Sequence, residues 1–324
     1  MNLKVLIISL FGLLFIFSTI SIVVFTEILV PIYGQNENKN KNNVDSIFLF
    51  ANLSNVKVND INIAYKIYGN GNNIILLISG SGQTMNAWEP YFIKKLVASN
   101  NTVIVFDNRG IGNTTQGIKQ FSIEQFANDT VGLLEKLAID KKIDVLGFSM
   151  GSLIAQEIAL NYPEIINKLI LYGSTCGGKD ATLPDKKLMD IFYTLSNQEM
   201  LKDMSVDKIN KNILLLYFPE DWIKNNSQYL KNFPVTTESL DPEIFKLQGE
   251  AYMNWNGSCN IINNIKIPTL IIVGTDDVAT LPIDSVKLAQ KIPGAWLIQI
   301  KDAGHGLMYQ YPVKFSEIIQ VFLK

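Results

Sequence analysis

The chain has 324 residues, of which 48% are hydrophobic and 18% are charged, and its formal net charge is −2 at pH 7. This composition excludes a disordered chain, and the nearly balanced charge, with no basic patch, argues against a nucleic-acid-binding protein. The length fits one large domain with an insertion, or two domains, and the chain contains no internal repeat with a period of roughly 20 to 50 residues.

The N-terminal segment is apolar from Val5 to Phe25 and is followed by a polar stretch, QNENKNKNN. The apolar run exceeds the core of a signal peptide, roughly 7 to 15 residues, and is close to the roughly 20 residues that cross a bilayer. We therefore expect residues 1–33 to form a membrane anchor, with a cleaved signal segment as the alternative, and residues 34–45 to form a polar linker. Both alternatives predict an extracytoplasmic protein, anchored in the membrane or secreted. A buried core helix is a third possibility, but an all-apolar helix beyond a polar linker has nothing evident to pack against.

Regular alternation begins at residue 55, where NVKVNDINIAYKIYG alternates polar and apolar residues on both sides of Asn59-Asp60, as in an antiparallel hairpin. Short apolar runs follow at residues 74–79, 102–106, 143–148, 168–173, 269–274 and 295–300. Helical stretches lie between most of these runs or after the last, at residues 88–99, 122–138, 151–161, 283–291 and 313–323. Apolar strands that alternate with amphipathic helices predict an α/β fold, with a mostly parallel sheet, an N-terminal antiparallel hairpin and helices on both faces.

Residues 178–261 interrupt this alternation. Strand-like runs are absent there, and aromatic-rich helical segments take their place: LMDIFYTL, ILLLYFPEDWI and EIFKLQGEAYMNW. An insertion of this size between two strands predicts a helical cap over the carboxyl edge of the sheet. The core is then divided into residues 46–177 and residues 262–324.

Open parallel sheets bind ligands beyond the carboxyl ends of their strands, so chemistry is expected in the loops that follow the strands. The apolar run at residues 143–148 continues into GFSMG, a G-x-S-x-G pattern with Ser149 at its centre. The pattern alone is weak, but here it lies where a strand ends and a helix begins, which is the position of a nucleophile elbow. A helix N-terminus at this point also favours negative charge. Ser149 is therefore predicted to be a catalytic nucleophile, the alternative being a helix N-cap serine between two glycines.

A serine hydroxyl needs a base to remove its proton, and the usual base is a histidine held by a carboxylate. The chain contains one histidine, His305, in the loop after the last apolar run. Its place at the same edge predicts a general base rather than an ordinary buried or surface histidine. The carboxylate is expected on a third loop of this edge, where TLIIVGTDD offers two candidates, Asp276 and Asp277.

An oxyanion hole needs two backbone donors. One is expected to be the N–H of Met150, the residue after the nucleophile. The other is expected from the glycine-rich turn ISGSGQ after the first apolar run, with Ser81 N–H as the predicted donor.

Residues 54–177 and 262–324 resemble the α/β-hydrolase family. The resemblance rests on the GFSMG elbow, on the order serine, acid, histidine along the chain, on FDNRGIG at residues 106–112 and on GTDD followed by LP. One departure is Ser79-Gly80, which stands where the oxyanion turn of the family often begins with His-Gly. This departure removes a side chain that usually orders the turn, although the hole itself uses backbone N–H groups.

The resemblance also separates the two adjacent aspartates. In the family the acid usually lies three residues after the glycine that closes the strand, and counting from Gly274 implies Asp277. Asp276 is then expected to be a turn residue that hydrogen-bonds nearby backbone N–H groups.

Members of the family with this layout hydrolyse esters, lactones, amides or related bonds without a cofactor. The resemblance therefore implies a serine carboxylesterase or lactonase for small to medium apolar substrates, working through a Ser-His-Asp triad and an acyl-enzyme, with no cofactor and no metal. Dehalogenases and epoxide hydrolases of this fold place an aspartate at the elbow, so Ser149 argues against both. Two alternatives stay open: a cofactor-free perhydrolase or haloperoxidase-like enzyme, which uses the same triad, and a ligand-binding receptor on the same fold.

Several further residues are expected to stabilise the fold or to line the pocket. Asp107 and Arg109 are expected to form a loop-stabilising pair. Cys176 and Cys259 can pair in an oxidising compartment, and the sequence leaves their pairing open, as it does the oligomeric state. Aromatic residues at the elbow and in the insertion are expected either to line the pocket and cap or to pack in the core: Phe148, Tyr217, Phe218, Trp222, Tyr252 and Trp255.

Overall fold

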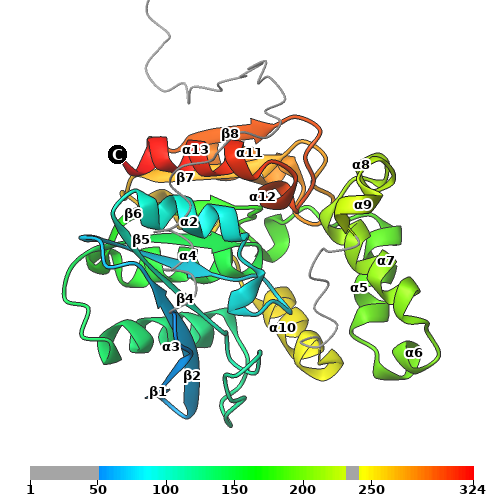
Figure 1. Ribbon diagram of the computed structural model, residues 1–324, viewed down its shortest axis with the longest axis horizontal. Coiled ribbons are helices and arrows are strands. Elements are labelled where there is room, and N and C mark those ends of the chain that lie inside the picture. The colour runs from blue at the N-terminus through cyan, green and yellow to red at the C-terminus, as the bar shows by residue number, and fades with distance from the viewer. Residues whose placement is uncertain (1–50, 231–240) are drawn as a thin grey trace, which may run out of the picture.

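The computed structural model describes residues 51–230 and 241–324 (Figure 1). The expected anchor at residues 1–33 and the linker at residues 34–45 lie outside the described residues, so both stay predictions. Within the two described ranges, no helix is long and apolar enough to cross a membrane.

One sheet of eight strands forms the centre of the described chain, in the order β1-β2-β4-β3-β5-β6-β7-β8. The first two neighbour pairs are antiparallel and the others are parallel. The mostly parallel sheet with an N-terminal hairpin is therefore confirmed. The strand bounds are β1 Ser54–Val58, β2 Ile61–Tyr68, β3 Asn73–Ile78, β4 Asn101–Phe106, β5 Ile143–Phe148, β6 Ile166–Tyr172, β7 Thr269–Gly274 and β8 Trp296–Ile300.

The hairpin follows from the polar and apolar alternation around Asn59-Asp60. Val58 lies opposite Ile61 across this two-residue turn, and Asn59 has a φ of +50°, a backbone region that asparagine tolerates better than most residues. Strand β3 lies between β4 and β5, with Ile78 beside Gly147 at the carboxyl ends of β3 and β5. The loops that follow these two strands are therefore neighbours at one edge of the sheet.

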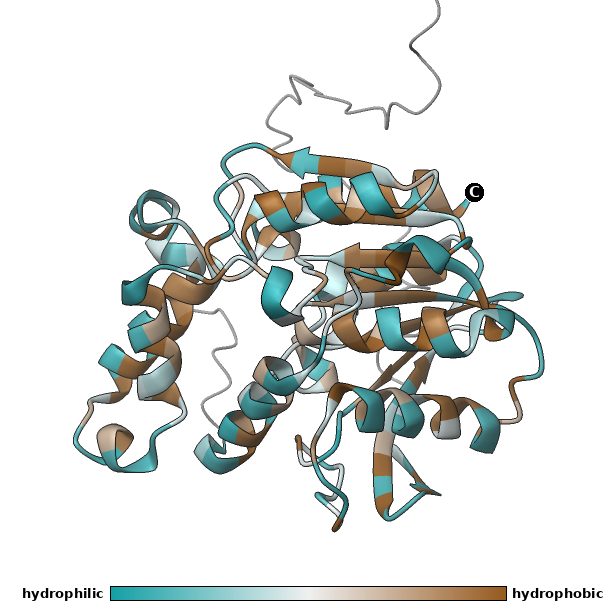
Figure 2. Cartoon of the chain, turned by 180° about the vertical axis from the view of Figure 1, so that it is seen from behind, coloured by the Kyte–Doolittle hydropathy of each residue, from teal (hydrophilic) through white to brown (hydrophobic). Residues whose placement is uncertain are grey.

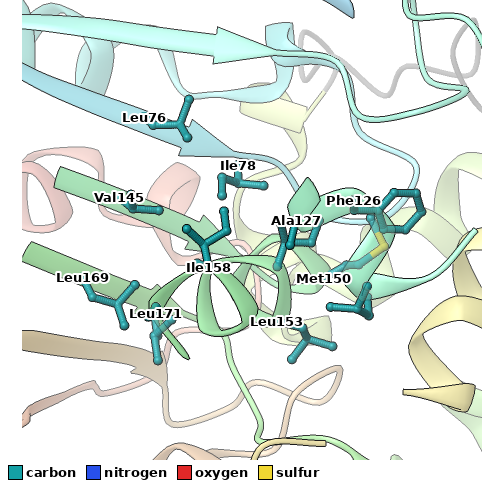
Figure 3. Packing of buried hydrophobic residues seen from close by; sticks show 14 of the residues in the cluster. Leu76, Ile78, Phe126, Ala127, Val145, Met150, Leu153, Ile158, Leu169 and Leu171 are labelled. Atoms are coloured by element: carbon teal, nitrogen blue, oxygen red, sulfur yellow. The ribbon is translucent and has the colours of Figure 1, made fainter. Parts of the chain in front are cut away.

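The parallel strands are buried on both faces, which explains their continuous apolar runs. Along β3, Leu76 faces one helical layer and Leu77 faces the other. Figure 3 shows the first layer, where Leu153 and Ile158 of α4 pack over Val145 of β5 and neighbouring strand residues. In Figure 2 the strands are largely hydrophobic, whereas the helices around them carry hydrophilic residues as well.

Helices cover both faces of the sheet, as predicted. One layer contains α3 (Ile123–Lys136) and α4 (Met150–Asn161), parts of which Figure 3 shows, and α11 (Pro282–Lys291). The opposite layer contains α2 (Pro90–Ala98), α12 (Leu307–Gln310) and α13 (Pro312–Leu323). Their starts follow ordinary capping rules: the Ser122 side chain accepts the N–H of Gln125 before α3, and α2, α11 and α13 begin with proline.

The insertion between β6 and β7 is helical. It contains α5 (Lys186–Leu195), α6 (Gln198–Lys202), α7 (Val206–Tyr217), α8 (Glu220–Asn225), α9 (Ser227–Leu230) and α10 (Pro242–Asn254). In Figure 1, α5 to α9 stand at one side of the sheet, and α10 lies between them and the core. The single helical segment expected over ILLLYFPEDWI is wrong, because the chain is extended at Phe218, with φ −131° and ψ 142°. Pro219 disfavours helical backbone at the residue before it, so α7 ends at Tyr217.

A disulfide joins the two ends of the insertion. The Cα atoms of Cys176 and Cys259 are 5.1 Å apart, within the usual range for a bridge, and both side chains are buried. Cys176 follows β6 and Cys259 follows α10, and Ser258 N–H donates to Cys176 O at 2.8 Å. The bridge therefore closes the base of the cap.

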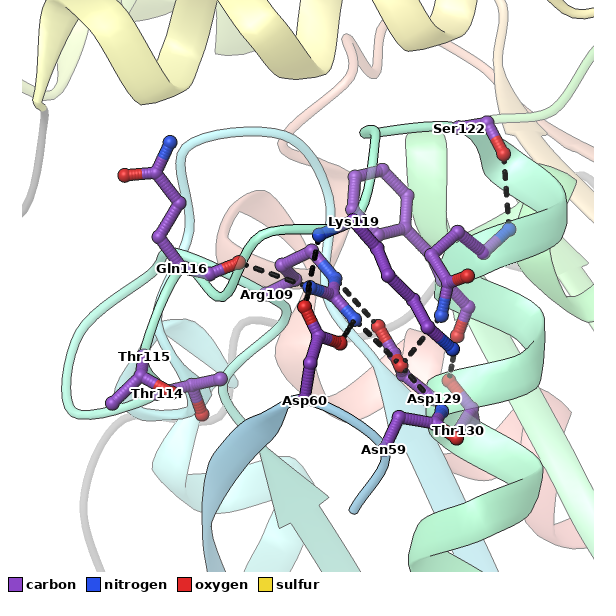
Figure 4. A network of polar contacts seen from close by, with 12 residues as sticks. Asn59, Asp60, Arg109, Thr114, Thr115, Gln116, Lys119, Ser122, Asp129 and Thr130 are labelled. Atoms are coloured by element: carbon purple, nitrogen blue, oxygen red, sulfur yellow. Dashed lines mark hydrogen bonds and ion pairs between the residues drawn. The ribbon is translucent and has the colours of Figure 1, made fainter. Parts of the chain in front are cut away.

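A buried ion-pair network holds the loop after β4 (Figure 4). Arg109 Nη2 lies 2.7 Å from Asp60 Oδ1 in the hairpin turn, and Arg109 Nε lies 2.8 Å from Asp129 Oδ2 in α3. The bond from Arg109 holds the pKa of the Asp60 carboxyl well below its ordinary value, against the opposing effect of burial. One guanidinium thus ties the hairpin, the loop and a helix together.

The expected pair between Asp107 and Arg109 is wrong. Asp107 Oδ1 accepts the N–H of Met85 at 2.7 Å, and its Oδ2 accepts the N–H of Asn113 at 2.9 Å. Asp107 therefore stabilises two loops by accepting backbone N–H groups, whereas Arg109 pairs with Asp60 and Asp129. Burial, opposed by these bonds, raises the pKa of the Asp107 carboxyl.

Candidate active site

Ser149 lies on the sharp turn between β5 and α4. Its backbone has φ 54° and ψ −122°, a combination that residues other than glycine rarely adopt, so the turn is strained. Two backbone bonds close it: Ser149 N–H donates to Tyr172 O at 2.9 Å, and Ser152 N–H donates to Ser149 O at 2.8 Å. Ser149 remains half-buried, which is the geometry of a nucleophile elbow.

Close packing explains the two glycines of the pattern. A side chain at Gly147 would overlap the carbonyl of Gly151, and a side chain at Gly151 would overlap the carbonyl of Ile78. The first turn of α4 can therefore approach β3 and β5 only when both positions are glycine.

The loop after β8 brings His305 to the same edge. His305 Nδ1 lies 2.8 Å from Oδ2 of Asp277, in the turn after β7, and the exposed fractions of the two residues are 6% and 1%. A methyl group at Gly173 would lie 2.9 Å from His305 Cε1, and Gly173 directly follows Tyr172, whose carbonyl binds Ser149 N–H. The imidazole and the elbow therefore lie close together at the end of β6.

The Asp277 carboxylate determines the tautomer of His305. An ionised carboxylate can only accept, so the shared proton belongs to Nδ1 and Nε2 is left free to accept another. Thr280 Oγ1 donates to the same carboxylate oxygen at 3.0 Å, and Asp277 Oδ1 accepts the N–H groups of Ala279 at 2.9 Å and Thr280 at 2.8 Å. These bonds fix the carboxylate in the orientation that faces the imidazole.

Asp276 is adjacent to Asp277 but is exposed. Its Oδ1 accepts a bond from Thr275 Oγ1 at 3.1 Å, and in the described part of the chain it accepts none from a backbone N–H. The expected N–H bonds are therefore wrong for Asp276, because Asp277 receives them. Of the two candidate acids, the structure brings Asp277 to His305.

Buried groups on both sides fix the histidine loop. The Tyr172 hydroxyl donates to the His305 carbonyl, and burial raises the pKa of this phenol well above its ordinary value, so it remains a donor. The Phe148 ring lies 4.7 Å from the imidazole between centroids. From the cap, Tyr217 O accepts the N–H of Gly306 at 2.7 Å.

The glycine-rich turn after β3 adjoins the elbow. A methyl group at Gly80 would lie 3.1 Å from Ser149 Cβ. Gly80 N–H donates to Gln83 Oε1 at 3.0 Å, and Gly82 N–H donates to Gln248 Oε1 at 2.8 Å. Ser81 N–H lies between these two and has no protein acceptor within residues 51–230 and 241–324.

The second predicted donor, Met150, is the first residue of α4. The N–H groups of a first helical turn have no carbonyl partner in their own helix. Met150 N–H and Ser81 N–H are thus on the two segments that border Ser149, and both are available to an oxygen atom bound there.

A pocket of about 110 Å³ opens beside His305. Its apolar wall comes from the cap and consists of Leu188, Ile191, Leu215, Tyr217 and Phe218. The cap also contributes Asp185, Lys187, Pro219 and Glu220 to the lining, and Asp276 and Val278 line the pocket from the core side. Among the described residues, no group of three or more His, Cys, Asp or Glu side chains could hold a metal ion.

The six aromatic candidates divide between pocket and core. Tyr217 and Phe218 line the pocket, and Trp222 stacks on Phe218 with 4.6 Å between ring centroids. Phe148 and Trp255 are buried in the core clusters, where Tyr252 also packs.

Sequence reasoning missed three polar side chains at this site. Thr280 lies three residues after Asp277, and its hydroxyl could have been suggested by the turn sequence TDDVAT. Gln83 lies three residues after Gly80 and bonds back to it. Gln248 is 166 residues from Gly82, so no local pattern could have indicated it.

A family model described as alpha/beta hydrolase fold matches residues 73–312. The chain is 30% identical over 265 residues to a Mycobacterium tuberculosis protein named as a non-heme bromoperoxidase, BpoC, with 78% of this chain and 94% of that protein covered. It is 24% identical over 266 residues to a 2-hydroxy-6-oxononadienedioate/2-hydroxy-6-oxononatrienedioate hydrolase of Pseudomonas sp., with 79% and 89% covered.

Solved structures show the same fold. The enol-lactonase from Burkholderia xenovorans LB400 matches with a TM-score of 0.71 at 23% identity, covering 83% of this chain and 99% of that one.

Proposed function

The chain belongs to the α/β-hydrolase-fold family, and from this premise we propose that it is a serine hydrolase, a carboxylesterase or lactonase for small to medium apolar substrates. One observation carries the proposal: His305 Nδ1 and Asp277 Oδ2 are 2.8 Å apart at the sheet edge where Ser149 occupies a strained turn. Nucleophile, base and orienting acid therefore come from three loops of one edge, as covalent acyl transfer requires.

In the proposed mechanism, Ser149 is the nucleophile. Asp277 keeps the proton of His305 on Nδ1, so Nε2 removes the proton of Ser149 Oγ as this oxygen attacks the carbonyl carbon. The imidazolium, stabilised by Asp277, then returns the proton to the leaving alkoxide. A water molecule attacks the acyl-enzyme by the same route, which releases the acid and restores Ser149.

The negative charge that develops on the carbonyl oxygen needs two donors. We assign this role to the N–H groups of Ser81 and Met150, which border Ser149 from β3 and from α4. Donors of this kind act where charge develops, and removal of one typically costs about 10² to 10³ in kcat. No cofactor is required for these steps.

The cap supports an apolar acyl or alcohol group as the substrate. Leu188, Ile191 and Leu215 offer aliphatic surface next to His305, and Tyr217 and Phe218 offer aromatic surface. The lactonase and hydrolase names of similar proteins agree with a carbonyl substrate. The proposal therefore includes esters and lactones, with a small molecule as the partner.

A second candidate is a cofactor-free perhydrolase or haloperoxidase-like enzyme. It is favoured by the 30% identity to the protein named as a non-heme bromoperoxidase. In such a reaction, hydrogen peroxide takes the place of water on the acyl-enzyme and leaves with the acyl group as a peracid, so the same three residues would serve. A third hypothesis is a ligand-binding receptor on this fold, which predicts binding without turnover.

We also propose an extracytoplasmic location, anchored by residues 1–33 or secreted after their removal. The apolar run from Val5 to Phe25 and the Cys176–Cys259 bridge support it, because disulfides persist in oxidising compartments. A full-length protein that resists extraction from membranes by carbonate would support an anchor. Recovery of a soluble native chain beginning near residue 35 would support cleavage.

The decisive experiment compares Ser149→Ala with the wild type on p-nitrophenyl esters of graded chain length and with a fluorophosphonate probe. Loss of the nucleophile is expected to lower kcat by about 10³ to 10⁶ and to abolish labelling, with the fold intact. Ser99→Ala, at an exposed serine that follows α2, is the matched control and should behave as wild type.

The other outcomes divide the alternatives. Near-full turnover by Ser149→Ala would refute the mechanism. Labelling of the wild type without turnover on any ester would favour the receptor, and peracid formation with hydrogen peroxide that exceeds hydrolysis would favour the perhydrolase.

A further inference from the structure

Gln248 connects the cap to the turn that carries Ser81. It lies on α10, is 0% exposed, and accepts two bonds through the same oxygen: Gly82 N–H donates to Oε1 at 2.8 Å, and Ser81 Oγ donates to it at 3.0 Å. A backbone N–H can bond only to an acceptor, so the amide oxygen, not the nitrogen, must face the turn. The contact therefore has one orientation.

The other side of the turn is also tied to the cap. Gln83 Oε1 accepts Gly80 N–H at 3.0 Å, and Gln83 Nε2 donates to the hydroxyl of Tyr217 at 2.8 Å. Tyr217 is the last residue of α7. The N–H groups of Gly80 and Gly82 are thus bound by the side-chain amides of Gln83 and Gln248. Gln83 in turn contacts α7, and Gln248 belongs to α10. Because the residues on both sides of Ser81 are fixed in this way, they also fix the orientation of the Ser81 N–H.

The turn receives little side-chain support from its own first residue. Ser79 Oγ is buried and has no hydrogen-bond partner in the part of the chain that the structure describes. Gln248 Nε2 is likewise buried without a partner among the described residues. A buried unpaired donor destabilises a fold, so Gln248 is a poor choice for stability alone.

We propose that Gln248 is the positioning residue of the oxyanion turn, through which the cap sets the orientation of Ser81 N–H. This inference rests on the proposed hydrolase function. Gln248 does not contact the reacting atoms; it acts through Gly82 and Ser81. A cap that docks with α10 in place completes the oxyanion hole, and a cap displaced from the core leaves it incomplete.

The test is Gln248→Met, which keeps the size and the apolar stem and removes both bonds. Because the N–H of Ser81 is misplaced rather than deleted, kcat is expected to fall by about 10- to 100-fold, somewhat less than deletion of a donor costs. KM should change little, since the pocket wall is untouched. The melting temperature should change little, because the loss of two bonds to the half-buried Ser81 and Gly82 is offset by removal of the unpaired buried amide nitrogen. A purely structural residue would lower kcat and melting temperature together.

Two further variants sharpen the result. Ser81→Ala removes one of the two bonds to Gln248 and keeps the backbone donor, so the fall in kcat should be smaller than in Gln248→Met. The double variant should have the same kcat as Gln248→Met alone, because both substitutions remove the same contact. Gln198→Met, at an exposed glutamine in α6, is the matched control and should retain wild-type kinetics and stability.

The contrary results are distinct. Wild-type kcat in Gln248→Met, or a rise in KM with unchanged kcat, would overturn the positioning role while leaving the proposed function intact. A parallel loss of kcat and melting temperature, together with additive effects of Ser81→Ala, would assign Gln248 to structure alone. Near-wild-type turnover by Ser149→Ala would instead refute the proposed hydrolase mechanism, and with it the role of Gln248.

Discussion

The core and the cap of this protein are stabilised in different ways. In the core, β5 is buried at every residue, and Arg109 is 1% exposed and paired with two carboxylates. In the cap, the ion pairs Lys187–Glu220 and Lys202–Glu199 have both side chains more than half exposed. Within the cap, one small apolar cluster is separate from the core, whereas Phe218 and Ile244 pack in the core clusters. The buried residues of the separate cluster are Leu188, Ile191, Leu195, Leu216 and Phe245.

The core and the cap therefore have different roles at the candidate site. The core holds Ser149 and Asp277 at the ends of β5 and β7, which are buried at every residue, and His305 in the loop after β8. The cap adds the apolar pocket wall and two hydrogen-bonded contacts to the turn at residues 80–83, to which we assign the oxyanion role. Buried charges are costly to leave unpaired, whereas surface ion pairs contribute little. Substitutions in the core network should therefore have much larger effects than substitutions in the surface pairs of the cap.

The largest effect is expected at the acid of the core. Asp277→Asn should lower kcat by about 10³ to 10⁴, because an amide no longer selects the His305 tautomer or stabilises the imidazolium. Asp276→Asn, one residue away and without a bond to His305, should keep kcat near wild type, and any change is expected in KM because Asp276 lines the pocket. Steady-state kinetics of both variants on one ester make the comparison. A large loss at position 276 with little loss at 277 would reverse the assignment.

The buried ion-pair network should come next. Arg109→Met is expected to destabilise the protein by about 3–5 kcal/mol, since it leaves the buried Asp129 carboxylate and the half-buried Asp60 carboxylate without their cation. Urea unfolding of the variant and of the exposed-site control Lys142→Met gives the comparison. A destabilisation as small as that of the control would remove the proposed difference between core and cap.

The same network predicts a pH dependence. The bond from Arg109 lowers the pKa of Asp60, so this carboxyl stabilises the fold fully above the pKa of an unfolded aspartate, about 3.9, and less as the pH falls toward the lower folded value. The stability difference between wild type and Arg109→Met should therefore narrow below about pH 4. Urea unfolding at pH 3 and pH 7 measures it, and a constant difference would contradict the role of Asp60.

The bridge at the base of the cap should have a somewhat smaller effect. Replacing Cys176 and Cys259 together by serine should cost about 2–4 kcal/mol, because the bridge closes a long loop. Core strands β6 and β7 remain paired on both sides of the insertion, so the loss should loosen the cap before the sheet. Hydrogen exchange with and without reductant can resolve the order. Equal loss of protection in β5 and in α7 would show that the two regions unfold as one unit.

The smallest effect is expected in the surface pairs of the cap. Lys187→Met breaks the pair with Glu220, in which both partners are well exposed, so the melting temperature should not change measurably. Differential scanning calorimetry of the variant beside wild type is sufficient. A clear fall in melting temperature would mean that cap stability depends on its surface charges.

Most of the core could be predicted from local patterns. The runs at residues 143–148 and 269–274 coincide with β5 and β7, because strands buried on both faces must be continuously apolar. The elbow was indicated by GFSMG at a strand end, since only glycines allow the close approach around Ser149. The choice of Asp277 needed the resemblance to a family, as local sequence left two adjacent aspartates equivalent.

The arrangement of the cap could be predicted only in part. Its helical character follows from apolar spacing, and the break at Phe218-Pro219 follows from a rule that the expectation of one continuous segment overlooked. The contact of Gln248 with Gly82 spans 166 residues, and Arg109 pairs with Asp60 and Asp129 rather than with its neighbour in sequence. Periodicity and short motifs report interactions between near neighbours along the chain. Which side chains meet at the sheet edge depends on how α10, the hairpin and the loops pack together, and that packing is a property of the whole fold.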